Sequence, residues 1–275
     1  MRGSTAQRVR PARNWNGIPW REMWDRRELV AALVRHELQV RYRQTVLGVA
    51  WVIGQPLITT LILSLVLTRL TGKSHDGIPY PLFVYVGLAP WAYISHALTK
   101  NAACFVLYPG LVNRVCLPRL LVPLAVTLAA LVDFVVALAV LPCIMLYYQV
   151  TPSLTILALP LVIALMVVTV FGMGIWLAVF NAEFRDIAYA LPFLLQLGLF
   201  SSPMFYSSDI VPASWRWLYA LNPVAGIVEG MRWSLLATQP MPWPLLLISA
   251  GSALVILCTG LYVFQCREPR LADVI

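Results

Sequence analysis

Charge is scarce in this 275-residue chain, since 12% of its residues are Asp, Glu, Lys or Arg while 60% are hydrophobic. A soluble domain normally carries about twice that share of charge, so the composition excludes an ordinary soluble protein. From Gln44 to Thr68 no charged residue occurs over 25 positions. A helix of roughly 20 apolar residues crosses the hydrocarbon of a bilayer, because each residue adds about 1.5 Å. The chain is therefore predicted to be an integral membrane protein.

Patterns typical of metal, disulfide and nucleotide sites are missing as well. The five cysteines form no CxxC pair and have no histidine at ligand spacing, which argues against a zinc site or a disulfide framework. No DxD or HxxxH motif occurs. The segment 71–74 resembles the end of a phosphate-binding loop, but Leu67 stands where that loop needs glycine. We expect no metal, cofactor or nucleotide site in this chain.

Positive charge, in contrast, is concentrated at the N-terminus. Ten of the twenty Lys and Arg residues precede residue 44. They are Arg2, Arg8, Arg10, Arg13, Arg21, Arg26, Arg27, Arg35, Arg41 and Arg43. Basic flanks of a first span stay on the cytoplasmic side, where they meet anionic lipid headgroups. Because the other cations stand mostly at span ends and form no contiguous basic surface, nucleic acid is not expected as a partner.

Uncharged apolar runs bounded by charge or turn residues predict an all-α integral membrane protein with six transmembrane helices. They cover residues 46–68, 79–99, 119–148, 154–180, 187–206 and 244–265. With both termini in the cytoplasm, sixteen Lys and Arg residues lie inside and four outside, as the positive-inside rule requires. The predicted organisation is a basic tail (1–19), an interface helix (20–45), one six-span domain (46–266) and a C-terminal tail (267–275).

Residues 20–45 are predicted to form an amphipathic helix. Apolar residues repeat at helical spacing from Leu29 to Leu38, although Glu37 and Arg41 interrupt this face. Such a segment lies either in the plane of the inner leaflet or on a cytosolic partner, and we favour the membrane plane.

Residues 209–236 are apolar but short and broken by Pro212 and Pro223. They predict an external re-entrant hairpin of two half-helices, because a seventh span would place the C-terminus outside. Glu229 within this segment either pairs with Arg232, three residues on, or lines an external exit.

Asp133 is the sole carboxylate inside the third predicted span. An intramembrane acid is a functional candidate by default, but it can also be a structural acid bonded to a neighbouring helix. With no second intramembrane acid or lysine to form a relay, we favour the structural role.

Aromatic residues gather in the outer halves of the spans and in the external segment. An interfacial aromatic belt explains many of them. Others fit a path in which aromatic rings stack on the apolar faces of sugars. Periodicity alone does not separate the two groups.

Several short segments carry a resemblance to a known family. They are Leu38–Gly48 with Trp51 and Gln55-Pro56, Tyr80–Leu88 with Pro90-Trp91, Pro118-Arg119, Val132–Phe134, Phe184–Asp186, and Leu221–Gly226 with Glu229-Gly230. In this order the chain resembles the membrane subunit of type 2 ATP-binding-cassette exporters that carry lipid-linked polysaccharide, namely O-antigen, capsule or teichoic acid.

The resemblance implies a non-catalytic permease subunit of the bacterial inner membrane. It implies a homodimer whose seam is the translocation path, and two separate ATPase subunits that hold ATP and magnesium. The cytoplasmic loop 100–118 would contain the coupling helix. The substrate would be a polymer, O-antigen above all, on a polyprenyl pyrophosphate.

The resemblance and the residue chemistry together give three groups of candidate site residues. The candidates for the entrance of the lipid pyrophosphate are Arg35, Arg41 and Arg43. The candidates for the polysaccharide path and exit are Tyr42, Tyr85, Trp91, Phe200, Phe205, Tyr206, Trp215, Trp217 and Glu229. The candidates for ATPase coupling are Tyr108, Asn113, Arg114, Glu183, Arg185 and Asp186. Alternative functions are a type 2 exporter of drugs or lipids and a polyprenyl-dependent membrane glycosyltransferase.

Overall fold

The computed structural model describes residues 25–43, 48–71, 77–107, 118–237 and 241–274, and the regular secondary structure within them is helical. The all-α class predicted from the sequence is thereby confirmed.

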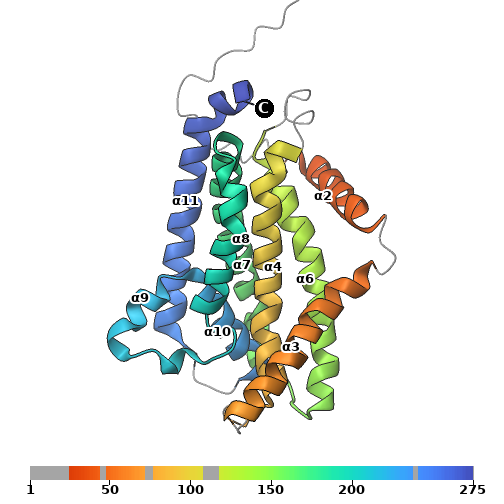
Figure 1. Ribbon diagram of the computed structural model, residues 1–275, viewed down its shortest axis with the longest axis vertical. Coiled ribbons are helices and arrows are strands. Elements are labelled where there is room, and N and C mark those ends of the chain that lie inside the picture. Colours follow the sequence, from red (N-terminus) through yellow and green to blue (C-terminus); the bar gives the residue numbers. More distant parts are fainter. Residues whose placement is uncertain (1–24, 44–47, 72–76, 108–117, 238–240, 275) are drawn as a thin grey trace, which may run out of the picture.

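Helices occupy every range in which a span was predicted (Figure 1). Their bounds are α3 Val49–Thr71, α4 Tyr80–Leu107, α6 Leu121–Tyr147, η1 Leu154–Ala158 leading into α7 Leu159–Glu183, α8 Asp186–Ser201 and α11 Trp243–Val274. In the described part of the chain, four helices are long and apolar enough to cross a membrane: Tyr80–Leu107, Leu121–Tyr147, Leu154–Glu183 and Trp243–Pro269. The apolar parts of α3 and α8 are shorter, at Ala50–Val66 and Asp186–Ser201.

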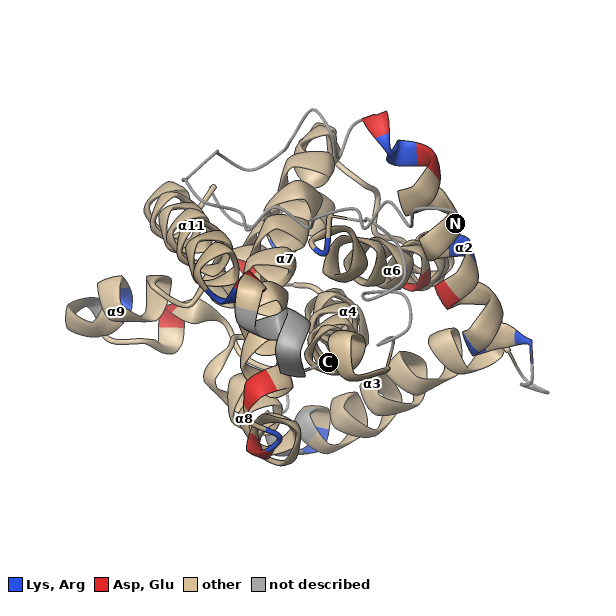
Figure 2. Cartoon of the chain, turned by 90° about the horizontal axis from the view of Figure 1, so that it is seen from above, with Lys and Arg blue, Asp and Glu red and all other residues tan. Residues whose placement is uncertain are grey.

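Helix α4 forms the centre of the bundle. Its apolar window is 72% buried, compared with 22% for α11, because α3, α6, α7, α8 and α10 all pack against α4. Helix α11 packs on α7 at the periphery (Figures 1 and 2). Seen from above, charged residues lie mainly on α2 and near the ends of the other helices (Figure 2). This distribution is the one expected of a bundle surrounded by lipid.

Glycines allow α7 and α11 to approach closely. A Cβ atom on Gly172 would lie 2.8 Å from Cα of Leu257, and one on Gly260 would lie 2.8 Å from the carbonyl oxygen of Gly172. Side chains at either position would force the helices apart. Small residues serve this purpose at helix contacts in membranes, where close packing rather than the hydrophobic effect drives association.

The predicted interface helix is α2, Arg27–Tyr42, and it runs diagonally beside the upper part of α6 (Figure 1). No residue of α2 is fully buried, which fits a helix on the outside of the bundle. Residues 20–24 and 44–45 of the predicted range lie outside the described residues. Orientation in the membrane plane stays a prediction.

The segment predicted to be external, here called the external segment for that prediction alone, contains three short turns of helix and one longer helix. They are η2 Ser208–Ile210, η3 Ala213–Trp215, α9 Arg216–Ala220 and α10 Pro223–Leu236. The Asn222 side chain caps α10 by accepting a hydrogen bond from the Val224 amide at 3.1 Å, with Pro223 at the first helical position. Helix α10 is buried between α4, α7 and α11, whereas α9 projects from the bundle (Figure 1).

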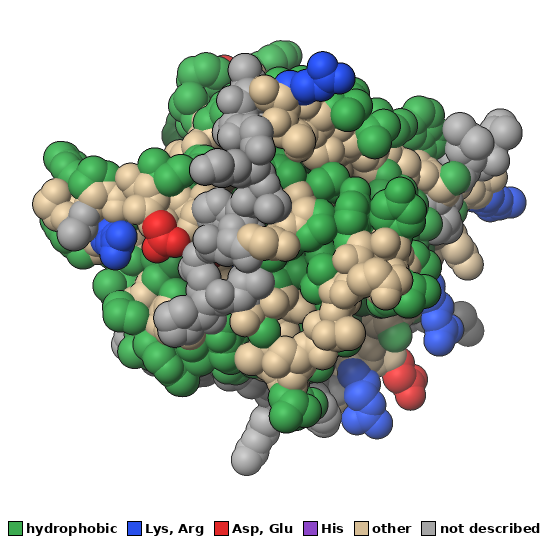
Figure 3. Space-filling view, turned by 90° about the horizontal axis from the view of Figure 1, so that it is seen from below, with side chains coloured by type: hydrophobic (Ala, Val, Ile, Leu, Met, Phe, Trp, Pro, Cys, Tyr) green, Lys and Arg blue, Asp and Glu red, His purple; other side chains and the backbone are tan. Residues whose placement is uncertain are grey.

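The lower face of the molecule, to which this segment contributes, carries many hydrophobic side chains and few charged ones (Figure 3). Trp215 and Trp217 are 60% and 62% exposed. Exposed tryptophans beside apolar residues are typical of the boundary between hydrocarbon and water.

Two helices extend beyond the ends of the predicted spans. Helix α4 continues to Leu107 rather than ending at residue 99, so the first part of the predicted loop 100–118 is helical. Helix α11 continues to Val274 through the predicted tail 267–275. In both cases a charged residue was taken as the end of the helix, although Lys and Arg are good helix formers and only the apolar run stops there.

Candidate functional site

The carboxylate of Asp133 joins the interface helix to the bundle. Asp133 lies near the middle of α6, about 18 Å along the helix axis from Leu121 at about 1.5 Å per residue. The Arg41 guanidinium forms an ion pair with its Oδ2 atom, and the Tyr42 hydroxyl donates a hydrogen bond to Oδ1. The side chains of Arg41 and Asp133 are 19% and 15% exposed. The pair is thus largely withdrawn from solvent.

The local sequence of α2 explains why Arg41 points inward. Leu29, Val30 and Leu33 pack on an apolar cluster that includes Leu121 of α6 and Phe264 of α11. Arg41 stands eight residues after Leu33, at helical spacing on the same face. A charge that continues an apolar face must find a partner in the protein, and Asp133 is that partner.

Tyr42 acts as a neutral donor in this cluster. Burial raises the pKa of its phenol above the ordinary value, and the positive charge of Arg41 offsets this only in part. The hydroxyl therefore stays protonated and donates a hydrogen bond to the carboxylate of Asp133.

The structure separates the three arginines predicted at the pyrophosphate entrance. Arg41 belongs to the cluster, whereas Arg35 and Arg43 are exposed on α2. Asp133 is bonded to a neighbouring helix, as the favoured structural role requires, but its charged partner was missed. The sequence signal for this partner is Arg41 itself, because it interrupts the apolar face of α2.

A pocket of about 200 Å³ adjoins the ion pair. It lies between α3, α4 and α6, and its polar lining residues include Gln55 of α3 and His96 of α4 together with Arg41 and Asp133. The ring nitrogen Nε2 of His96 is buried and has no hydrogen-bond partner among the described residues. Neither Gln55 nor His96 was singled out as a site residue from the sequence.

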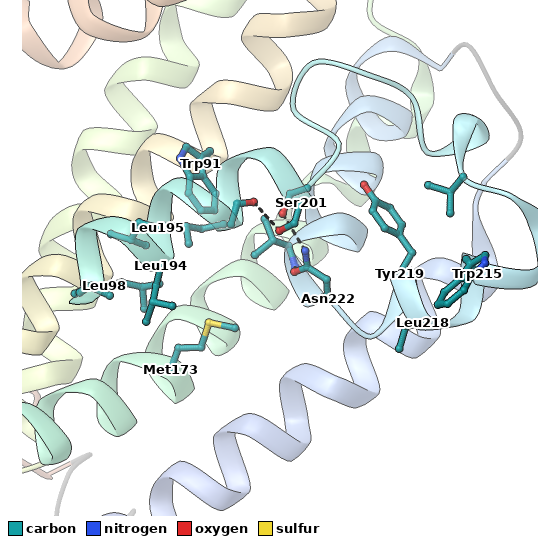
Figure 4. A pocket seen from close by; sticks show the side chains of 16 residues that line it. Trp91, Leu98, Met173, Leu194, Leu195, Ser201, Trp215, Leu218, Tyr219 and Asn222 are labelled. Carbon is teal, nitrogen blue, oxygen red and sulfur yellow. Dashed lines mark hydrogen bonds between the residues drawn. The ribbon is translucent and has the colours of Figure 1, made fainter. Parts of the chain in front are cut away.

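A larger groove of about 580 Å³ lies where α8 meets the segment that follows it (Figure 4). It is bounded by α4, α7, α8 and the external segment, and most of its lining is apolar. Trp91 lies on its wall against Gly198 of α8, where a Cβ atom would come within 2.8 Å of the indole ring. Ser202 and Asn222 add polar groups to the lining, and the Asn222 amide donates to the Ser202 hydroxyl at 2.9 Å.

Predicted path residues reach this groove in part. Trp91 and Trp215 line it, as does Tyr219, which was not among the candidates. The Tyr219 hydroxyl lies 3.3 Å from that of Tyr206, which in turn donates to the carbonyl of Phe200 at 3.3 Å.

The remaining aromatic candidates lie in several places. Phe205 pairs with Phe200 at a ring separation of 6.4 Å. Trp217 is exposed on α9, and Tyr42 lies beside Arg41 and Asp133. Tyr85 is fully buried and donates to the carbonyl of Ala137 at 2.7 Å, so its place is in the contact between α4 and α6.

Glu229 lies in a buried ion pair and not on an open exit. It pairs with Arg232 at 3.2 Å, one of the two possibilities left open by the sequence, and both side chains are less than a tenth exposed. Arg232 also donates to the carbonyls of Met204 at 2.9 Å and Tyr206 at 3.0 Å, and it stacks on Phe83 at 3.6 Å. The pair thus fixes the chain after α8 against α10 and α4.

The described coupling candidates fall into two groups. Glu183 forms an ion pair with Arg267 of α11 and is engaged within the chain. Arg185 and Asp186, in the turn between α7 and α8, are exposed, and Phe184 beside them is 56% exposed. These three side chains are available to a partner.

The other coupling candidates, Tyr108, Asn113 and Arg114, lie outside the described residues. In the part of the chain that the structure describes, no three His, Cys, Asp or Glu side chains lie close enough together to hold a metal ion.

Comparison with known proteins places this architecture among transporters. The profile of the family "ABC-2 type transporter" matches residues 28–236. The O-antigen export system permease protein RfbA of Klebsiella pneumoniae is 24% identical over 249 residues, covering 90% of this chain and 95% of the relative. RfbA of Myxococcus xanthus is 29% identical over 257 residues, covering 92% and 97%. The polysialic acid transport protein KpsM of Escherichia coli is 27% identical over 251 residues, covering 88% and 94%.

The family profile spans the interface helix, the helices from α3 to α8 and the external segment through α10. The chain belongs to the ABC-2 type transporter family.

Proposed function

We propose that this chain is the permease subunit of an exporter that moves polysaccharide linked to polyprenyl pyrophosphate across the bacterial inner membrane. The O-antigen of lipopolysaccharide is its cargo. The observation that carries the proposal is the similarity to O-antigen export permeases over 90% and 92% of the chain. Similarity to a polysialic acid transport protein favours capsular polysaccharide as a second candidate.

The membrane domain has six spans, with α3 and α8 as the first and fifth, and both termini in the cytoplasm. The external segment dips back toward the membrane as a re-entrant hairpin in which α10 is the longer arm. Support comes from the burial of α10 among the long helices.

Two copies of the chain meet along α3 and α8 and enclose the path. Leu61 and Leu65 of α3 and Phe193 and Leu197 of α8 are among the exposed apolar side chains. The same two helices expose Gln55 and Gln196. A glutamine amide is costly against hydrocarbon, so these faces are suited to a protein contact or a watered path rather than to lipid.

The substrate enters at the inner end of α3. Its pyrophosphate meets Arg41 and Arg43, with Arg35 behind them, because guanidinium groups bind phosphate oxygens in a bidentate manner. The sugar chain then passes aromatic side chains in the outer half, which stack on sugars without requiring one sequence.

The chain itself catalyses no reaction. Two ATPase subunits dock on the cytoplasmic side, where they bind ATP and magnesium. The exposed side chains of Phe184, Arg185 and Asp186 support a docking surface there, together with the loop that follows α4. Closure of the ATPase dimer draws the docked segments together and opens the path.

Deletion of the gene tests this function. We expect lipid-linked polymer to accumulate on the cytoplasmic side and to disappear from the cell surface. Complementation with the double variant R41Q/R43Q should fail to restore export although the complex with the ATPase still assembles. Arg216→Gln, on the external segment, is the control and should restore it. Unchanged surface polymer would refute export, and loss of polymer synthesis would point to a transferase.

A further inference from the structure

The ion pair between Arg41 and Asp133 has an unusual position for a structural contact. Asp133 lies near the middle of α6, and Arg41 reaches it from α2 on the outside of the bundle. A charge inside a membrane helix is expensive and marks a functional position by default. The guanidinium that balances Asp133 comes from the interface helix, where the proposed function has the substrate anion enter.

The pocket beside the pair offers room and further polar groups. Its volume of about 200 Å³ exceeds several times what a single water needs and is enough for a phosphate group. Gln55 and the buried Nε2 atom of His96 face it from α3 and α4. Polar groups from three helices thus surround a space next to a guanidinium.

Asp133 and a phosphate compete for the same partner. Both are anions that arginine binds through charge-assisted hydrogen bonds, and phosphate offers more oxygens and more charge. A phosphate in the pocket would therefore displace the carboxylate. The displaced Asp133 keeps the Tyr42 hydroxyl as a hydrogen-bond donor.

We propose that the Arg41–Asp133 pair is an exchangeable contact that regulates how Arg41 binds the phosphate end of the lipid carrier. At rest Asp133 holds the guanidinium, and when the lipid phosphate occupies the pocket it takes the place of Asp133 beside Arg41, Gln55 and His96. This inference rests on the proposed export function. The role of Asp133 is to keep the site weak, because a transported group must leave as readily as it enters.

Binding of farnesyl pyrophosphate to the permease–ATPase complex in nanodiscs tests the exchange. Asp133→Asn removes the competitor, so the complex should bind the probe at least tenfold more tightly while export slows. Arg41→Gln should bind at least tenfold more weakly, and R41Q/D133N should bind like R41Q alone. Asp209→Asn, a carboxylate of the external segment, is the matched control and should leave binding unchanged.

A second variant tests the same exchange in case the D133N complex assembles poorly. Asp133→Thr carries the same expectation, since a threonine hydroxyl in a membrane helix bonds to its own backbone, as Thr127 and Thr169 do here at 2.8 Å. Wild-type or weaker binding by assembled D133N or D133T would overturn the exchange and leave the export function standing.

Two further results would overturn more of the proposal. Wild-type affinity and export in Arg41→Gln would remove Arg41 from the binding of the lipid phosphate. Inorganic pyrophosphate binding as tightly as the farnesyl ester would show that the site takes a free anion and not a lipid carrier.

Discussion

Replacing Arg232 with methionine removes a buried guanidinium and leaves an unbranched apolar side chain above Phe83. The wild-type group donates to the carbonyls of Met204 at 2.9 Å and Tyr206 at 3.0 Å and pairs with Glu229 at 3.2 Å. In the variant, Glu229 keeps the hydrogen bond that it accepts from the Ser208 amide at 3.1 Å.

Loss of one member of a buried ion pair costs about 3–5 kcal/mol, because the other charge stays buried without compensation. The two carbonyls each lose a charge-assisted bond worth roughly 1.5–3 kcal/mol. These terms overlap, since one side chain makes all the contacts, so we expect R232M to lower the free energy of unfolding by about 3–5 kcal/mol in total.

Denaturant unfolding of the purified protein in detergent gives this free energy, and limited proteolysis reports loosening of the chain between α8 and α10. Arg216→Met is the matched control, because Arg216 is exposed and should change stability by no more than about 0.5 kcal/mol. In R232M/E229Q no charge is left without a partner, so the double variant should be more stable than R232M. An R232M protein within about 1 kcal/mol of wild type would refute the role of this pair.

Three further outcomes follow from the structure. Charge reversal of Arg185 and Asp186 should reduce co-purification of the ATPase without lowering the thermal stability of the permease, because both side chains are exposed; unaltered co-purification would remove the turn from the docking surface. Trp91→Ala should slow export by about tenfold or more, because about 1.5–3 kcal/mol of aromatic contact in the groove is lost. Trp243→Ala, at an exposed tryptophan, should leave the rate unchanged. Equal export rates of the two variants in flux assays would contradict a substrate path through the groove. In a background without the natural cysteines, Thr151→Cys should react with a membrane-impermeant maleimide added to whole cells, and Arg185→Cys should react only after lysis; the opposite pattern would reverse the topology.

The presence of the helices could be predicted because long uncharged runs have few other solutions in a bilayer. The residues at which the helices end were harder to predict from the sequence. Lys100 and Arg267 both lie inside helices, and each stands where an apolar run stops. The sequence shows where hydrophobicity ends, but a helix continues as long as its backbone finds partners and its side chains find packing.

The candidate site was predictable only where it is local. The Glu229–Arg232 pair follows from a spacing of three residues on one helix. The Arg41–Asp133 pair joins helices far apart in the chain, and periodicity does not tell which faces meet. Tyr85 illustrates the same limit, since its buried hydrogen bond to Ala137 depends on the contact between α4 and α6.

ATP-driven movement of a lipid-linked glycan in proteoliposomes tests export most directly. The permease and its ATPase are reconstituted with a fluorescent polyprenyl-pyrophosphate oligosaccharide, and the fraction that reaches the lumen is measured by its protection from an added glycosidase. We predict that protection rises with ATP and magnesium and only when both subunits are present. Equal protection without the permease, or none with the complete complex and ATP, would contradict the assignment of this chain as a polysaccharide exporter.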